Sequence, residues 1–465
     1  MTINFPTIEN RPGPKYLAIA EAIEQGVKSG SIPEGSKLPP QRDLADFLGI
    51  TLSTVTRGYA LAKQHGYVSG EVGRGSFVRD PRKSSSAFKF EGSHAPDKRS
   101  DMDLTCYRPA PSEQLAAVAR ACSALPARLS PRMASLRYPP PAGLSSHRAL
   151  GRDWLAKAGI ETNADNVVVC GGAQQGISAL LLALAAPGEV VLTESLTYSG
   201  LREVAGLLRL RLEGIAMDDS GMVPDSLAQA AASGARIVFV QPTLHNPTTT
   251  VMPLERRKEI VDVARRFDLT LIEDDVCGAL VTDRPPPLAA LAPERTCHVT
   301  SLSKCLSPPL RVAFLSVPPE LVERVSAAHR TLTLSAPPIM AEIASLLIES
   351  GDADKLIEAQ RVETARRHEI ARAILEGHSF QAHPCGFHLW LPLPAHWRAV
   401  DFASAARVLG VKVISADNFF VGRGHSPHAV RVAVTSTATH ESLHRGLQIL
   451  RDLLSSGNHL LGTEI

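Results

Sequence analysis

Side chains that could carry chemistry follow a series of apolar runs in the C-terminal part of the sequence. Lys304 comes after the run HVTSLS, with Arg311 seven residues later, and Asp274 comes after the run LTLIE. Tyr198 comes after the run VVLTES, and a tight Asn246-Pro247 turn comes after the run IVFV. Each of these is more often structural than catalytic when taken singly. One such residue follows each apolar run, and a random sequence would rarely show this order.

A glycine turn, GGAQQG at residues 171–176, follows the run VVVC and leads into the apolar helical segment ISALLLALA. Such a turn frees backbone N–H groups at a helix N-terminus for an anion, although the signal is weak by itself. The spacing of Ser301 and Lys304 also imitates the SxxK motif of penicillin-binding enzymes. The companion motifs of that class are missing, which excludes it.

The apolar runs themselves predict the elements that position these side chains. The runs are rich in β-branched residues, lack polar alternation, and alternate with helical segments; they lie at residues 167–170, 190–193, 237–240, 269–273 and 298–303. Strands of this kind are buried on both faces, which predicts a mostly parallel α/β sheet. Because ligands collect at the carboxyl ends of such strands, the polar side chains are expected to meet there.

This order of residues resembles the fold type I, pyridoxal-phosphate-dependent aminotransferases, from about residue 103 to the C-terminus. The resemblance implies that Lys304 forms a Schiff base with the cofactor aldehyde and that Asp274 keeps the pyridine nitrogen protonated. It implies that Asn246 hydrogen-bonds the ring oxygen and that Tyr198 stacks on the ring. The cofactor phosphate would lie against five further residues, Ala173, Gln174, Ser301, Ser303 and Arg311.

Two further positions bear on the chemistry that the resemblance implies. Arg431, in HAVRVAV, stands where the family holds a substrate carboxylate, a role that suits a bidentate guanidinium. The family usually carries a tyrosine two or three residues after the ring aspartate, but here Val276 and Cys277 occupy those positions. We therefore expect one hydrogen bond to the cofactor to be lost, which favours sensing over turnover. Glu273 and Asp275 are expected to be structural.

The N-terminal eighty residues follow another pattern. Apolar residues at helical spacing predict helices over residues 14–29, 40–48 and about 52–65, with Leu44, Phe47 and Leu48 on one face of the second helix. A short hairpin through Gly73-Arg74-Gly75 follows. Three helices and a glycine-turned hairpin predict a winged helix-turn-helix.

Residues 13–79 closely resemble the GntR-type winged-helix DNA-binding domain, through the stretch LPPQRDLADFLGITLSTVTRGYALAKQHGYVSGEVGRGSFV. The resemblance implies that the third helix enters the major groove and that the wing tip reaches the minor groove. The implied DNA-binding residues are Arg42, Ser53, Thr54, Thr56, Arg57, Gly73 and Arg74. At the position after the helix cap, where the family often carries arginine, this chain has Leu52. Its apolar side chain could contact a thymine methyl group but cannot donate hydrogen bonds to guanine. An interaction module that never meets nucleic acid is the alternative.

Residues 80–102 are polar, rich in serine and lysine, and without a period, as expected of a flexible linker. This predicts a winged-helix domain over residues 1–79 and an aminotransferase-like domain over residues 103–465, with a smaller α+β subdomain from about 335. Residues 1–83 carry 11 basic and 8 acidic side chains, whereas the remainder carries 38 and 39. The modest positive surplus per subunit suggests that tight operator binding needs two winged helices together.

Seven scattered cysteines without CxxC pairs indicate a reduced protein and no zinc or redox site, so no metal is expected. The start of the sequence lacks the features of a signal peptide, and the most apolar segment, residues 177–186, is about half of what a bilayer crossing needs. A cytoplasmic location is expected.

The combination of both halves resembles the MocR subfamily of bacterial transcription regulators. It implies a homodimer that binds operator DNA and senses pyridoxal phosphate or an amino compound through an aldimine at Lys304. Two alternatives stay open: an active aminotransferase that carries a DNA-binding domain, and a regulator whose aminotransferase fold is only a dimerisation scaffold. The effector, the operator and the sign of regulation are left open.

Overall fold

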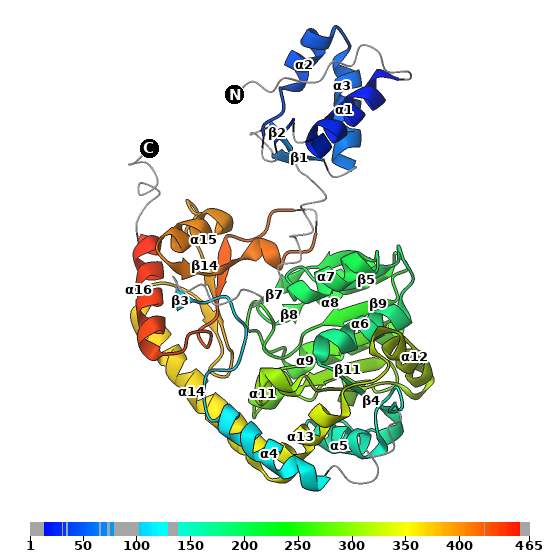
Figure 1. Cartoon of the computed structure of the whole chain (residues 1–465), viewed down its shortest axis with the longest axis vertical. Helices are drawn as coiled ribbons and strands as arrows, with labels where there is room; N and C mark the ends of the chain where they lie inside the picture. The colour runs from blue at the N-terminus through cyan, green and yellow to red at the C-terminus, as the bar shows by residue number, and fades with distance from the viewer. Residues whose placement is uncertain are drawn as a thin grey trace. The chain divides into compact units, whose positions relative to one another are not determined.

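The computed structural model describes residues 14–29, 31–33, 36–64, 67–71, 75–78, 102–128, 138–422 and 424–455. The chain divides into two units, Met1–Phe90 and Glu91–Ile465 (Figure 1). The wing-tip residues Gly73 and Arg74 and the predicted linker up to residue 101 lie outside the described residues.

The first unit contains the predicted winged helix-turn-helix. Its elements are α1 (Lys15–Ser29), α2 (Gln41–Leu48), α3 (Leu52–Gln64), β1 (Val68–Glu71) and β2 (Gly75–Val78). Gly49 ends α2 in the left-handed conformation at φ 59°, which costs glycine little, and the two strands pair antiparallel. The fold predicted for this part of the chain is confirmed.

The core of this unit lies between α1 and α3. Val55, Tyr59 and Ala62 of α3 are buried as their spacing indicates. Gly58 permits the close approach, since a Cβ atom there would lie 2.8 Å from the side chain of Ile19 on α1. Phe47, however, is 73% exposed although Leu44 of the same helix is buried.

The second unit is built on a central sheet, in which seven strands pair among the described residues. Their order is β4 (Val167–Cys170), β12 (Ala313–Ser316), β11 (Thr296–Ser301), β10 (Thr270–Asp274), β9 (Ile237–Val240), β5 (Val190–Glu194) and β6 (Arg211–Ile215). Of these seven described strands, β12 alone pairs antiparallel with its neighbours. The predicted mostly parallel sheet and its five predicted strands are confirmed, and β6 and β12 are additions.

Both faces of this sheet are buried, and alternate residues of one strand face different helices. Val168 and Cys170 belong to the apolar cluster that includes α6 (Ala173–Leu184) and α12 (Val322–Thr333). Val167 and Val169 belong to the cluster that includes α5 (Ser145–Ala156) and α13 (Pro338–Glu349). This explains why the strand sequences show no polar alternation.

Further helices and hairpin strands complete the large part of this unit. These are α4 (Gln114–Arg128), α7 (Ser199–Leu207), β7 (Met217–Asp218), β8 (Gly221–Met222), α8 (Pro224–Ala231), α9 (Leu254–Arg266), α10 (Leu288–Leu291) and α11 (Leu302–Cys305). The long helix α14 (Asp352–Ile374) runs from this part to the smaller subdomain (Figure 1).

The smaller subdomain has its own sheet, with strand order β13 (Gln381–Ala382), β14 (Leu389–Pro392), β17 (Ala429–Val432) and β16 (Ile414–Ser415). Its helices α15 (Ala399–Val408) and α16 (His440–Ser455) share an apolar core with these strands. The strand β3 (Met102–Asp103), which begins at the last residue of the predicted linker, pairs with β15 (Val411–Lys412). The first described residues of this unit therefore belong to the smaller subdomain.

No single helix in the described ranges is long and apolar enough to span a membrane. By length and composition alone, only the bent pair formed by residues 319–333 and 338–349 could do so.

Candidate functional site

The carboxyl ends of the parallel strands bring the predicted side chains to one edge of the sheet. Asp274 is the last residue of β10, and Lys304 lies in the short helix α11 that directly follows β11. Tyr198 and Asn246 follow β5 and β9 in the same way. The topology thus explains the regular order of polar residues along the sequence.

Lys304 lies in the single turn of α11, which Ser301 caps. The Oγ atom of Ser301 accepts a hydrogen bond from the backbone N–H of Ser303 at 3.2 Å and so caps the helix. The Nζ atom of Lys304 donates to the backbone carbonyl of Tyr107 and lies 4.6 Å from the centre of the Tyr107 ring. The lysine amine therefore faces the segment that follows β3.

Several groups that can donate hydrogen bonds converge where α6 begins. Gly172 precedes the helix with φ 106°, and a Cβ atom there would clash with Nη2 of Arg311. Only glycine fits both the backbone and the guanidinium. The Nη1 atom of Arg311 also lies 3.5 Å from Oγ of Ser303. The first N–H groups of α6, at Ala173 and Gln174, this guanidinium and the serine hydroxyl suit a phosphate.

Asp274 is buried, and one of its oxygens is unpaired. Oδ2 accepts a hydrogen bond from Nε2 of Gln241 at 3.0 Å, whereas Oδ1 has no hydrogen-bond partner among the described residues. Burial, and to a lesser degree the charge of Asp275, raises the pKa of this carboxyl to about 7. A protonated pyridine nitrogen would supply both the missing donor and a compensating charge. The residues present thus fit the cofactor that the resemblance implies.

Asn246 and Arg431 meet in the same site. Arg431 on β17 is fully buried, and its Nη1 atom donates to Oδ1 of Asn246 at 2.9 Å. Its Nη2 atom donates to the carbonyl of Thr105 at 2.6 Å, and the rings of Tyr107 and Phe419 lie 5.5 and 5.1 Å from Cζ. A buried guanidinium that donates to neutral oxygens can exchange them for a carboxylate.

Tyr198 stands at the N-terminus of α7 and is half-buried. Gly200 makes room for it, because a Cβ atom at that position would clash with the Tyr198 ring and would lie 2.6 Å from Oε1 of Gln174. Nε2 of Gln174 donates to the carbonyl of Gly200 at 2.9 Å. The aromatic ring and the start of α6 are thereby brought to the same part of the site.

Two residues of the site were missed by the sequence interpretation. Gln241 is the first polar residue after the run IVFV, so the strand-end pattern could have found it. Tyr107 lies outside that pattern, because it comes from the segment that follows β3. Its hydroxyl and the thiol of Cys277 lie 2.9 Å apart, and its ring meets His388 edge-on with centroids 5.2 Å apart.

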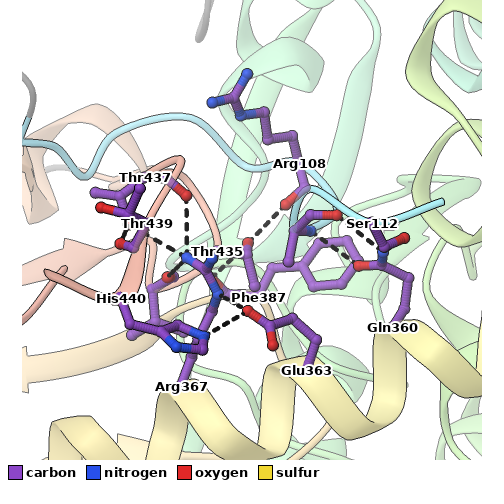
Figure 2. A network of polar contacts seen from close by, with 12 residues as sticks. Arg108, Ser112, Gln360, Glu363, Arg367, Phe387, Thr435, Thr437, Thr439 and His440 are labelled. Atoms are coloured by element: carbon purple, nitrogen blue, oxygen red, sulfur yellow. Dashed lines mark hydrogen bonds and ion pairs between the residues drawn. The ribbon is translucent and has the colours of Figure 1, made fainter. Parts of the chain in front are cut away.

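The segment after Tyr107 is anchored by a polar network (Figure 2). The Thr435 hydroxyl donates to the carbonyl of Arg108 at 2.6 Å, and Gln360 on α14 bonds both the N–H and the carbonyl of Ala110. Beside them Arg367 donates to Glu363 and to the carbonyls of residues 434 and 437. The network holds residues 108–112 against α14 and the smaller subdomain.

The acidic neighbours of Asp274 have other contacts. Glu273 accepts hydrogen bonds from the N–H groups of Leu288 and Ala289 at the start of α10 and is paired with His298. Asp275 is paired with Arg284. These contacts support α10 and the loop before it.

In the first unit, five of the predicted DNA-binding residues lie on α2 and α3. Arg42, Ser53, Thr56 and Arg57 are exposed, and Thr54 is half-buried. The Thr56 hydroxyl donates to Oε1 of Gln41 at 2.8 Å, which ties α3 to α2. The guanidinium of Arg57 lies over the Tyr16 ring at 4.3 Å. Gly73 and Arg74 fall outside the described residues.

Comparisons with known proteins match both units. Residues 15–78 match the model of bacterial regulatory proteins of the gntR family, and residues 102–450 match that of aminotransferase class I and II. The chain is 32% identical to the HTH-type transcriptional regulator YdeF of Bacillus subtilis (strain 168), over 97% of this chain and 96% of that protein. It is 26% identical to the vitamin B6 salvage pathway transcriptional repressor PtsJ of Salmonella typhimurium, over 83% and 87% of the two chains.

The second unit also matches solved structures. The α-aminoadipate aminotransferase LysN of Thermus thermophilus, complexed with N-(5'-phosphopyridoxyl)-L-leucine, superposes with a TM-score of 0.69 at 24% identity. The match covers 77% of this chain and 92% of that chain. This likeness shows the aminotransferase fold and confirms the fold class predicted for this unit.

Proposed function

Because the chain belongs to the MocR subfamily of GntR-type transcriptional regulators, which carry an aminotransferase class I and II domain, we propose that it binds pyridoxal 5'-phosphate at Lys304. We propose further that its binding to operator DNA responds to this cofactor or to an amino compound. The observation that carries the proposal is that Lys304 and Arg431 each hold a carbonyl of one short segment, at Tyr107 and Thr105.

The residues proposed to hold the cofactor are the ones that the strand ends bring together. Asp274 would accept the pyridinium N–H through Oδ1, Asn246 would bond the ring oxygen, and Tyr198 would cover the ring. The phosphate would lie at the start of α6, against Ala173, Gln174, Ser301, Ser303 and Arg311. When bound, the cofactor would supply an aldehyde with which the amine of Lys304 can condense with loss of water, and an effector amine could displace the lysine amine from that carbon.

The effector would compete for contacts that the protein makes with itself. An effector carboxylate at Arg431 would replace the carbonyl of Thr105 and the amide oxygen of Asn246 as acceptors. Occupation of the Lys304 amine would release the carbonyl of Tyr107. Both exchanges act on residues 105–107, which follow the predicted linker of residues 80–102 closely in sequence. Binding energy at the site can therefore shift the conformation of that segment.

The DNA-binding half of the proposal rests on the exposed residues of α2 and α3. Arg42 and Arg57 would contact phosphates, while Ser53, Thr54 and Thr56 would face the major groove, and Gly73 and Arg74 would reach the minor groove. We propose domain boundaries at residues 79 and 103 and a homodimer that presents two winged helices to paired half-sites. The vitamin B6 salvage function in the name of PtsJ supports the vitamer itself as one candidate signal.

The test is a DNA-binding assay on the full-length protein with the region upstream of its own gene. The assay is run without addition, with pyridoxal 5'-phosphate, and with the cofactor plus a panel of amino compounds. A change in affinity that is lost in Lys304→Ala is expected. Steady transamination of common amino acids would instead favour the enzyme alternative, and DNA binding indifferent to every addition would favour the scaffold alternative.

A further inference from the structure

The loop after Asp274 lacks a phenol, yet a phenol reaches that loop from elsewhere. Val276 and Cys277 occupy the positions where the resembling family carries a tyrosine. Cys277 is buried, and its thiol lies 2.9 Å from the hydroxyl of Tyr107. Tyr107 stands 170 residues earlier in the sequence. Only the fold brings its hydroxyl to the loop that follows the ring aspartate.

The Tyr107 ring is fixed inside the site from several sides. Its centroid lies 4.6 Å from Nζ of Lys304 and 5.5 Å from Cζ of Arg431. The ring of His388 meets it edge-on at 5.2 Å, and that of Phe387 is tilted against it at 5.6 Å. The side chain is 8% exposed. A ring held in this way has little freedom to move its hydroxyl, which favours a specific contact.

The two groups of the pair differ in strength as donors. Burial raises the pKa of Tyr107 well above its usual value, so the phenol keeps its proton at neutral pH. Burial also raises the pKa of Cys277, to about 12, so the thiol stays neutral. A neutral thiol is only a weak donor, whereas a phenol is a full donor.

We propose that Tyr107 supplies the donor that the loop after Asp274 lacks, and that its hydroxyl, rather than the Cys277 thiol, hydrogen-bonds the ring oxygen of bound pyridoxal phosphate. The inference rests on the proposed function, because it assumes that the cofactor binds at Lys304. The residue whose carbonyl accepts from the Lys304 amine in this structure would then contact the cofactor through its side chain. Cofactor binding would act directly on the segment that follows β3.

The test compares Tyr107→Phe with the wild-type full-length protein and with a matched control, Tyr138→Phe. Tyr138 lies in the same unit but is 83% exposed, so removing its hydroxyl should change nothing. Tyr107→Phe keeps the ring beside Lys304 and removes only the donor. We expect cofactor affinity, measured by absorbance titration, to fall about tenfold or more, as for a lost hydrogen bond to a charged oxygen.

The visible absorbance of the bound cofactor distinguishes loss of this hydrogen bond from general damage to the fold. Without the donor, the negative ring oxygen is less stabilised and holds its shared proton more tightly. The pH midpoint of the visible absorbance of the bound cofactor should therefore rise in Tyr107→Phe and stay unchanged in Tyr138→Phe. An unshifted midpoint together with wild-type affinity would overturn the inference.

Cys277→Ala keeps the test decisive if Tyr107→Phe does not fold. This variant leaves the phenol in place and removes the thiol, so affinity within about twofold of wild type is expected. A loss as large as tenfold would assign the contact to the thiol and overturn the inference. Failure of the proposed function looks different, because the wild type would then show no visible absorbance that depends on Lys304.

Discussion

The Nζ atom of Lys304 donates a hydrogen bond to the backbone carbonyl of Tyr107 and lies 4.6 Å from the centre of that ring. This contact joins the lysine of α11 to the segment that follows β3. A molecule that occupies the lysine amine must rearrange this contact. The proposed sensing follows from this relationship.

Replacement of Lys304 by alanine should abolish the visible absorbance of bound pyridoxal phosphate and its loss on borohydride treatment. The reason is that alanine has no amine to bond the cofactor aldehyde. Lys258→Ala, on the exposed face of α9, is the control, since its amine is paired with Glu255 on the same helix. Absorbance retained by Lys304→Ala after desalting would place the cofactor elsewhere.

Asp274 should make the stability of the cofactor-free protein depend on pH. Its folded pKa, about 7, is higher than its unfolded value, so between pH 4 and 7 the unfolded chain releases this proton first. The free energy of unfolding therefore falls as the pH rises from about 4 towards 7, by an amount on the order of a few kcal/mol.

The measurement for Asp274 is the difference in melting temperature between wild type and Asp274→Asn at pH 5.5 and pH 8. The pKa values of buried histidines such as His388 are lowered and act in the opposite direction, but they contribute to both proteins and cancel in the difference. We expect the melting temperature of Asp274→Asn, relative to that of the wild type, to be higher at pH 8 than at pH 5.5. A melting-temperature difference that does not change with pH would contradict the raised pKa of the Asp274 carboxyl.

Replacement of Arg431 by lysine should remove the response to amino acids while the cofactor still binds. A lysine cannot form a bidentate contact with a carboxylate, and it leaves Asn246 or Thr105 without a donor, at a cost of about 1–3 kcal/mol in stability. Isothermal titration with amino compounds on the cofactor-loaded protein measures the effect. Arg324→Lys, an exposed residue of α12, is the control, and an unchanged response in Arg431→Lys would place the carboxylate elsewhere.

Replacement of Arg42 by alanine should weaken DNA binding about equally for all sequences. An arginine that contacts phosphate releases one counterion, so the slope of log affinity against log salt should fall by about 0.9 per contact. Lys28→Ala serves as the control, because the charge of Lys28 is balanced by Glu24 at 2.6 Å. If Arg42→Ala kept the wild-type salt slope, Arg42 would not lie on phosphate.

The sequence interpretation anticipated the parts of the site that local pattern determines. Asp274 ends one buried strand, Lys304 and Asn246 follow two others, and parallel pairing brings such positions to one edge of the sheet. The strand-end pattern does not predict contacts between residues that are far apart in the sequence. Tyr107 and Cys277 meet only because β3 joins the smaller subdomain and places the next residues over the site.

There is also a physical reason why the strands β6 and β12 were not predicted. Residues 211–215 of β6, at the edge of the sheet, alternate between exposed and half-buried positions and only Ile215 is buried, so they do not form an apolar run. β12 is as short and as buried as the predicted strands β4 and β9, but it begins two positions after Arg311 and pairs antiparallel, outside the series of strands that site residues follow. Similarly, Phe47 shares the helical spacing of Leu44 but lies at 73% exposure, since no element of this unit covers it among the described residues.

The central claim is tested most directly by measuring operator affinity of the full-length protein at fixed salt, with and without pyridoxal 5'-phosphate, for wild type and Lys304→Ala. The proposal predicts that the cofactor changes the affinity of the wild type severalfold and leaves that of the variant unchanged. Equal affinities in all four conditions, or the same cofactor effect in both proteins, would contradict it.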